Sequence, residues 1–282
     1  MYVTKLRKYA YLVSLLLILP GLVSLFTQGL NLGIDFTGGS LIHVKFEKPV
    51  KMERIRNVLG QYEIDRGVPI QQAGENEYII RTPILTEQQS SQLVEGLRDQ
   101  LGDLEVLRID EVGAVIGKEL TNKALMATVI ACVLMLIYIT IRFEFKFGVG
   151  AVIALVQNVL IVVGVFSLFQ WEVDSSFIAA ILTILGYSIN DTIVVFDRIR
   201  ENLRLRRKEP YDVIVDKSVL QTVNRSINTV LTVVFCLGAL LLLGGATLKY
   251  FVLAMLIGIV IGCFSSIFIA SPIWYDLKIR EN

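Results

Sequence analysis

The sequence predicts a polytopic α-helical membrane protein with six transmembrane helices: one helix, a small α+β extracytoplasmic domain, and then five more helices. Three observations support this prediction. The 282-residue chain is 54% hydrophobic and only 19% charged, whereas soluble domains average about 45–50% apolar and about 25% charged residues. Its mean hydropathy is +0.62. The apolar residues gather in six stretches of about 20 residues, the length a helix needs to cross a bilayer.

The first apolar stretch, residues 9–27, follows a basic start and is not followed by an Ala-x-Ala cleavage site. A cleaved signal peptide ends in such a site. We therefore interpret residues 1–28 as a cytoplasmic N-terminus and an uncleaved first helix. The five later spans are expected at about residues 122–141, 147–169, 176–197, 227–247 and 250–271.

The distribution of Lys and Arg predicts the orientation of these helices, because cytoplasmic loops carry an excess of both. Residues 198–226 hold eight basic residues, whereas residues 170–175, between the third and fourth spans, hold none. The 198–226 loop, both termini and the tail of residues 272–282 are therefore expected in the cytoplasm. Residues 29–121 are expected outside the cytoplasmic (inner) membrane, and the spans are expected to contact its lipids.

The polar stretch of residues 29–121 has the pattern of a small α+β domain. Strands are expected at residues 40–47, 68–72, 77–82 and 104–112, and helices at residues 51–62 and 87–101. The order β-α-β-β-α-β is that of the ferredoxin-like split motif. This fold hosts many functions and names none. The only histidine, His43, falls in the first strand and is expected at the surface.

A carboxylate inside a span costs about 2.5–3.5 kcal/mol on insertion scales and marks a candidate functional site. Asp191 lies deep within the fourth span, directly after Asn190, and Gly186 lies one turn from Asn190 on the same stripe. Asp197 lies at the inner end of this span, beside basic residues. It either supports the site or is a solvated boundary residue.

The start of the fifth span offers partners for Asp191. Arg225, Asn228 and Thr232 lie at helical spacing, and the fourth and fifth spans are antiparallel. Asp191 and Arg225 are therefore a candidate charge pair. Burial favours the neutral form of a carboxyl group, and a nearby guanidinium favours the charged form. A conformational change that separates the two would switch between these regimes. Alternatively, the pair only ties two helices together.

The residue inventory argues against an enzyme. An intramembrane aspartyl protease needs aspartates on two facing helices, but Asp191 and Asp197 share one helix. A zinc or serine hydrolase needs a histidine or another base in the membrane, and the only histidine is His43. Residues 113–119 depart from the P-loop pattern. We therefore predict no ATP site, no cofactor and no metal site. With a net charge of +1, we also predict no nucleic-acid partner.

Two segments resemble a known family. LGIDFTGGS spans residues 32–40, and GYSINDTIVVFDRIREN spans residues 186–202. Together they resemble the SecF family of protein translocase subunits, part of the RND superfamily, and the likeness extends over essentially the whole chain. In the first segment, Gly33, Gly38 and Gly39 permit a tight turn before the strand. Asp35 is expected to cap or bond backbone N–H groups there.

The resemblance implies a function that the spacing of residues does not show. Members work with a separate SecD, join the SecYEG channel, often with YajC, and use the proton-motive force (sodium in some organisms) to pull or release preproteins outside. It also implies that Asp191 and Arg225 take part in ion coupling. Two alternatives stay open. One is an RND-type exporter of a small solute or lipid, which the six helices and the small outer domain count against. The other is a non-conducting translocon assembly scaffold.

Overall fold

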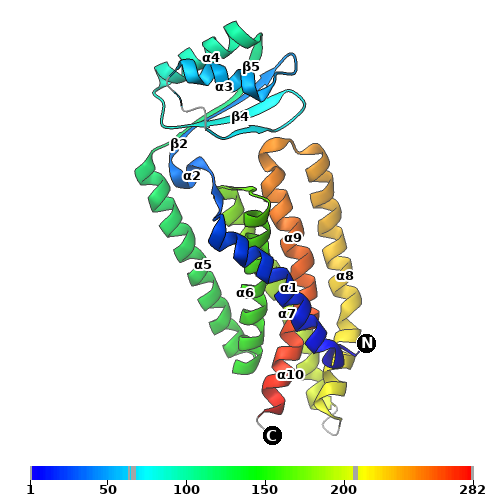
Figure 1. Cartoon of the computed structure of the whole chain (residues 1–282). Coiled ribbons are helices and arrows are strands. Elements are labelled where there is room, and N and C mark those ends of the chain that lie inside the picture. Colours follow the sequence, from blue (N-terminus) through cyan, green and yellow to red (C-terminus); the bar gives the residue numbers. More distant parts are fainter. Residues whose placement is uncertain (1, 63, 65–67, 206–208, 281–282) are drawn as a thin grey trace. The chain divides into compact units, whose positions relative to one another are not determined.

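The computed structural model describes residues 2–62, 64, 68–205 and 209–280, and the account below concerns these residues. The chain divides into two compact units (Figure 1). The helical unit comprises residues 1–31 and 125–282, and the sheet unit comprises residues 32–124.

Six helices in the described residues are long and apolar enough to cross a membrane. The first five are α1 (Val3–Thr27), α5 (Ala114–Arg142), α6 (Phe145–Leu168), α7 (Ser175–Leu205) and α8 (Tyr211–Leu243). The sixth consists of α9 (Lys249–Ser265), the π-helix η2 (Ser266–Ala270) and α10 (Ser271–Ile279). The predicted class of a polytopic helical membrane protein with six spans is confirmed.

The structure corrects the predicted ends of several helices. The predicted loop of residues 198–226 is largely helical, because α7 continues to Leu205 and α8 begins at Tyr211. Helix α5 begins at Ala114 rather than near residue 122, and the predicted tail is helical as far as Ile279. Hydropathy detects only the apolar part of a helix. Arg, Lys, Glu and Leu favour the helical state and therefore extend these helices beyond their apolar parts.

Helices α6 and the sixth span form the interior of the helical unit. More than half of the apolar window of each is buried, whereas almost none of that of α5 is buried. Phe147 of α6 stacks on Trp274 of α10 with ring centroids 4.7 Å apart, and it also contacts Phe196 of α7. Helix α1 crosses α6 closely at Gly21 and Gly164, where a Cβ atom on Gly21 would lie 2.6 Å from the Cα atom of Gly164.

The sheet unit contains a four-stranded antiparallel sheet and two longer helices. Its elements are, in chain order, β2 (Gly39–Phe46), α3 (Met52–Gln61), β3 (Ile70–Gln72), β4 (Glu77–Thr82), α4 (Glu87–Leu101) and β5 (Leu104–Val112). The strand order in the sheet is β3-β4-β2-β5. The short elements β1 (Asn31–Leu32), α2 (Ile34–Thr37), β6 (Glu172–Val173) and η1 (Ala246–Leu248) complete the chain.

The core of the sheet unit lies between the sheet and helices α3 and α4. Alternate residues of β2, Ile42, Val44 and Phe46, are buried together with Leu59 of α3 and Leu93 of α4. The period of two in the strand and the helical spacing in α3 and α4 place these apolar side chains on the facing surfaces. This packing holds the unit together through apolar burial.

The expected surface position of His43 is wrong, because its side chain is buried and only 6% of the residue is exposed. Burial lowers the pKa of the imidazole, against the opposing attraction of Glu77, whose carboxylate oxygen lies 3.7 Å from Nε2. Strand alternation alone could not predict this, since both faces of β2 are largely covered. His43 is therefore a neutral, buried residue at neutral pH.

Candidate functional site

Asp191 lies on α7 where this helix meets α8. Ser226 of α8 is almost fully buried, and its hydroxyl donates a hydrogen bond to Asp191 Oδ1. Ser266, the first residue of the π-helix η2, lies beside the same carboxylate. The carboxylate is therefore surrounded by hydroxyl groups from two other helices. A π-helix within an α-helical span often marks a functional position.

The ion pair between Asp191 and Arg225 that the sequence predicts is not formed. Within the described residues, Arg225 is close enough to act electrostatically on the carboxylate, but its own side chain is exposed. The adjacent residue, Ser226, occupies the bonding position instead. A rotation of about 100° per residue separates neighbouring side chains on a helix, so residues 225 and 226 cannot both face α7.

Further buried hydroxyl and amide groups extend this cluster across three helices. Thr192 Oγ1 lies 2.8 Å from Ser266 Oγ, and the Ser266 hydroxyl also reaches the carbonyl oxygen of Ser188 at 3.3 Å. On the other side, Asn158 Nδ2 of α6 donates to Ser188 Oγ at 2.7 Å. We call Asp191, Ser188, Thr192, Ser226 and Ser266 the hydroxyl cluster.

Ser188, Thr192 and Ser226 are candidate functional-site residues that the sequence did not predict. The spacing of two of them is a pattern that could have revealed them, because Ser188 and Thr192 lie four residues apart on one face of the span that carries Asp191. Serine and threonine are common in membrane helices, where they bond their own backbone. Thr192 Oγ1 indeed also donates to the carbonyl oxygen of Ser188 at 3.0 Å. Only the neighbouring helices show which hydroxyl groups also bond across an interface.

The other predicted polar residues lie on the outward side of α7 and α8. Gly186 and Asn190 are exposed on α7, and Asn228 and Thr232 are exposed on α8. The Tyr187 hydroxyl donates to the carbonyl oxygen of Thr229 at 3.3 Å and joins the two helices beside this face. We call Asn190, Arg225, Asn228 and Thr232, which are exposed polar side chains of these two spans, the exposed polar face.

Asp197 lies outside the hydroxyl cluster. Its Oδ1 atom lies 3.0 Å from Arg200 Nη2 and 3.6 Å from Arg142 Nη2, and Arg200 also donates to the carbonyl oxygen of Arg142 at 2.9 Å. These side chains are partly exposed, so the ion pairs contribute little to stability. Asp197 therefore belongs to a contact between the ends of α5 and α7.

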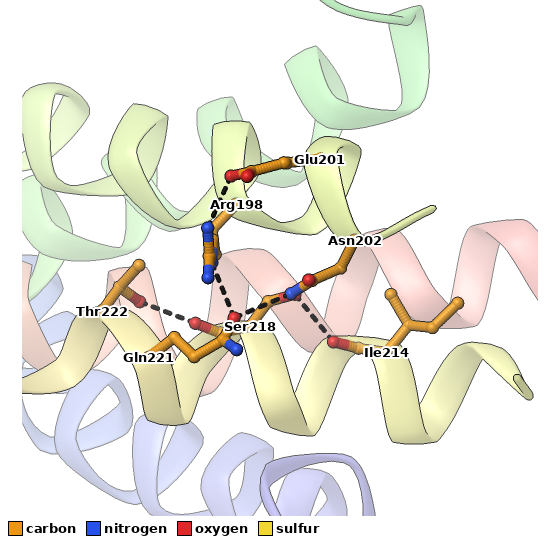
Figure 2. Close-up of polar contacts among 7 residues, drawn as sticks. All are labelled: Arg198, Glu201, Asn202, Ile214, Ser218, Gln221 and Thr222. Carbon is orange, nitrogen blue, oxygen red and sulfur yellow. Dashed lines mark hydrogen bonds and ion pairs between the residues drawn. The ribbon is translucent and has the colours of Figure 1, made fainter. Parts of the chain in front are cut away.

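A second polar group, buried at Asn202 and Ser218 and open to the outside at Gln221, joins α7 and α8 beyond Asp191 (Figure 2). Asn202 Nδ2 donates to Ser218 Oγ at 2.8 Å and to Gln221 Oε1 at 2.9 Å. Arg198 Nε donates to the same Gln221 oxygen at 2.6 Å. We call Arg198, Asn202, Ser218 and Gln221 the Asn202 clamp.

The glycine-rich segment after α1 forms the predicted turn into β2. Gly38 and Gly39 have φ angles of +74° and +131°, which favour glycine. A Cβ atom on Gly39 would also lie 2.6 Å from the Thr82 carbonyl oxygen of the neighbouring strand. Gly33 precedes helix α2, and Asp35 lies in its first turn.

The geometry allows chemistry with small cations and protons. A single carboxylate among hydroxyl groups in an apolar layer can take up and release a proton, or bind a monovalent cation through oxygen atoms. Among the described residues, no group of three or more His, Cys, Asp or Glu side chains is placed to hold a metal ion.

Comparisons with known proteins assign a family to this arrangement. Residues 92–280 match the family described as protein export membrane protein SecD/SecF, C-terminal, and residues 23–50 match the SecD/SecF GG motif. The protein translocase subunit SecF of Sebaldella termitidis is 46% identical over 97% of this chain and 91% of its own length. That of Vibrio alginolyticus is 40% identical over 98% of this chain and 89% of its own length.

Two solved structures are also similar. The crystal structure of SecDF from Thermus thermophilus, described as a translocon-associated membrane protein, has a TM-score of 0.93 and 37% identity over 99% of this chain. The structure of SecDF in the super-membrane-facing form has a TM-score of 0.75 and 36% identity over the whole chain. This chain spans 39% of each of those longer chains.

Proposed function

The chain belongs to the SecF family of protein translocase subunits, and on this premise we propose that it uses an ion gradient to promote preprotein translocation and release on the outer side. The observation that carries the proposal is the position of the Asp191 carboxylate inside a membrane span. This carboxylate accepts a hydrogen bond from Ser226, and Arg225 lies nearby without forming an ion pair with it. The carboxylate thus has two alternative partners on one helix.

We propose that Asp191 exchanges a proton, or in some conditions sodium, as α7 and α8 shift relative to each other. In the arrangement described here the carboxylate bonds Ser226. A small rotation of α8 would bring the guanidinium of Arg225 toward it, and this would favour the charged form and release of the ion. One elementary charge that crosses 100 mV supplies about 2.3 kcal/mol, enough to bias such a two-state equilibrium.

We propose SecD as the partner that covers the exposed polar face of Asn190, Arg225, Asn228 and Thr232. Polar side chains at membrane depth must face protein or water rather than lipid. The similar SecDF chains are also much longer than this one, which spans 39% of them. The SecYEG channel, YajC and the translocating preprotein are proposed as further partners. The proposed location is the cytoplasmic (inner) membrane, with both termini in the cytoplasm.

We also assign the sheet unit to the ferredoxin-like split motif and propose that it acts on the emerging preprotein outside the membrane. Two observations support the fold assignment. The helices α3 and α4 follow β2 and β4 in the chain, and the antiparallel strand order is β3-β4-β2-β5. The acidic excess of residues 29–121 does not oppose an outer location, because long domains translocate largely regardless of charge.

The test is preprotein export in cells that lack the native subunit and carry wild type, Asp191→Asn or Arg225→Ala. Asp197→Asn is the matched control, because it makes the same substitution in the same helix outside the hydroxyl cluster. We expect both site variants to lose export stimulation, and the control to retain it, at normal membrane levels of this chain and of SecD.

The second candidate function is a translocon assembly scaffold without ion flux. The hydrogen bond between Ser226 and Asp191 favours it, because that bond also ties α8 to α7. A scaffold needs no ionisable group, so Asp191→Asn would restore export fully. That result would replace the ion-coupling proposal.

A further inference from the structure

The Asn202 clamp uses both hydrogen atoms of the Asn202 amide nitrogen in bonds from α7 to α8. Asn202 is 2% exposed and Ser218 is not exposed. Asn202 Nδ2 donates to Ser218 and Gln221, and the Ser218 hydroxyl in turn donates to the carbonyl oxygen of Ile214 at 2.7 Å. Figure 2 shows these groups converging between α7 and α8. Opening the clamp would leave buried polar groups without partners, which is costly.

The contact between α7 and α8 at Asp191 has fewer hydrogen bonds than the Asn202 clamp. Asp191 Oδ1 accepts from Ser226, whereas the buried Oδ2 has no hydrogen bond of standard length among the described residues, although the Ser266 hydroxyl lies beside the carboxylate. Arg225 is exposed beside it. At this level Ser226 and Arg225 are alternative partners for one carboxylate, whereas at the clamp the Asn202 amide nitrogen already bonds two groups of α8.

The clamp and Asp191 lie on the same two helices at different heights. Asn202 follows Asp191 by 11 residues, which corresponds to about 16 Å along α7. The ion pairs of Asp197 with Arg200 and Arg142 lie between these two levels, but they are partly exposed and contribute little to holding α7. Between α7 and α8, the level of Asn202 is joined by two hydrogen bonds from the Asn202 amide, whereas the level of Asp191 is joined by the bond from Ser226. Two helices can change their separation at the level with fewer bonds while the other level stays closed.

We propose that the Asn202 clamp is the pivot of the α7–α8 pair: it stays closed while the two helices separate and rejoin at Asp191. Asn202 is then a positioning residue that sets the register of Asp191 against Ser226 and Arg225. This inference rests on the proposed ion-coupled function. It assigns a role to residues 198–202, the C-terminal end of the segment over residues 186–202 that resembles the family.

The test bridges α7 and α8 reversibly at each level in the full-length protein with SecD, in a background in which the three native cysteines are replaced. Arg198→Cys with Gln221→Cys places two thiols at the clamp and leaves the Asn202–Ser218 bond intact. Tyr187→Cys with Thr229→Cys places them one turn beyond the contact of Asp191 with Ser226. Each pair is joined by a short bifunctional thiol reagent that a reductant cleaves, and preprotein export is measured before bridging, after bridging and after cleavage.

We expect bridging at the clamp to leave export at the level of the unbridged variant. We expect bridging at residues 187 and 229 to abolish export, and cleavage to restore it. Loss of export at the clamp that the reductant reverses would show that the clamp opens and would overturn the proposal. Full export with residues 187 and 229 bridged would overturn it as well.

The two proposals fail in different ways. If Asp191→Asn supports export while bridging at residues 187 and 229 still abolishes it, the ion-coupling function is wrong but the pivot stands. If Asp191→Asn abolishes export while both bridges are harmless, the ion-coupling function stands and the pivot is wrong.

Discussion

At the scale of single residues, Asp191 could be found from the sequence but its partner could not. The cost of a carboxylate in an apolar span makes Asp191 conspicuous. The attraction of opposite charges predicts Arg225 as the partner of Asp191, yet the Ser226 hydroxyl forms the hydrogen bond. The orientation of α8 about its own axis decides between adjacent residues, and packing against α7 and the sixth span sets that orientation.

His43 makes the stability of the sheet unit depend on pH. Burial lowers its pKa in the folded state, so the folded state binds the proton less tightly than the unfolded state. The stabilisation is complete above the unfolded value of about 6.5 and falls as the pH drops through that value. We expect proteolysis of the sheet unit in the full-length protein to increase between about pH 7.5 and pH 5.

In His43→Gln, which does not titrate, this increase should be smaller. Glu77 raises the pKa of the imidazole and Arg108 lowers it. Both residues therefore stay unchanged in the variant. An equal increase in wild type and His43→Gln would show that other groups cause the pH dependence.

At the scale of elements, close helix contacts depend on small residues that a hydropathy pattern treats as neutral. Helix α1 reaches α6 because neither Gly21 nor Gly164 has a side chain. Small residues have this role in membrane helices generally, since packing rather than the hydrophobic effect drives their association. The sequence predicts that both helices exist, but not that their backbones touch at these two glycines.

Gly21→Ala should weaken the contact between α1 and α6. The new Cβ atom would meet the backbone of Gly164 at 2.6 Å, so the helices must separate. Overpacking of this kind costs about 1–3 kcal/mol. Thermal unfolding in detergent measures the effect. The matched control is Gly238→Ala in α8, where the new Cβ atom meets nothing within 4 Å and the melting temperature should not fall. Equal behaviour of the two variants would contradict the close contact.

At the scale of the whole molecule, the exposed polar face of α7 and α8 supports the proposal that this chain works with a partner. Helix α8 is one of the least buried spans, yet it carries Arg225 and Asn228 on its surface. Lipid cannot satisfy these groups. The proposed partner is SecD, and the exposed polar face is the surface on which we propose that it binds.

The reactivity of a cysteine placed on this face should show whether SecD covers it. In a background without the native cysteines, Asn228→Cys should react with a thiol reagent when the chain is expressed alone and become protected when SecD is co-expressed. Gln100→Cys, on the exposed surface of the sheet unit, should react equally in both cases. Unchanged labelling of Asn228→Cys would place the partner elsewhere.

Three features can be predicted from the amino-acid sequence alone: the six spans, the position of the intramembrane carboxylate and the glycine turn before β2. Each follows from local properties: apolar length, the cost of burying a charge, and the conformational freedom of glycine. Four others become visible only in the folded chain: the hydroxyl partners of Asp191, the outward position of Arg225, the burial of His43 and the Asn202 clamp. These features join residues distant in the chain, and they depend on how each helix is rotated and packed, which the packing of the whole unit fixes.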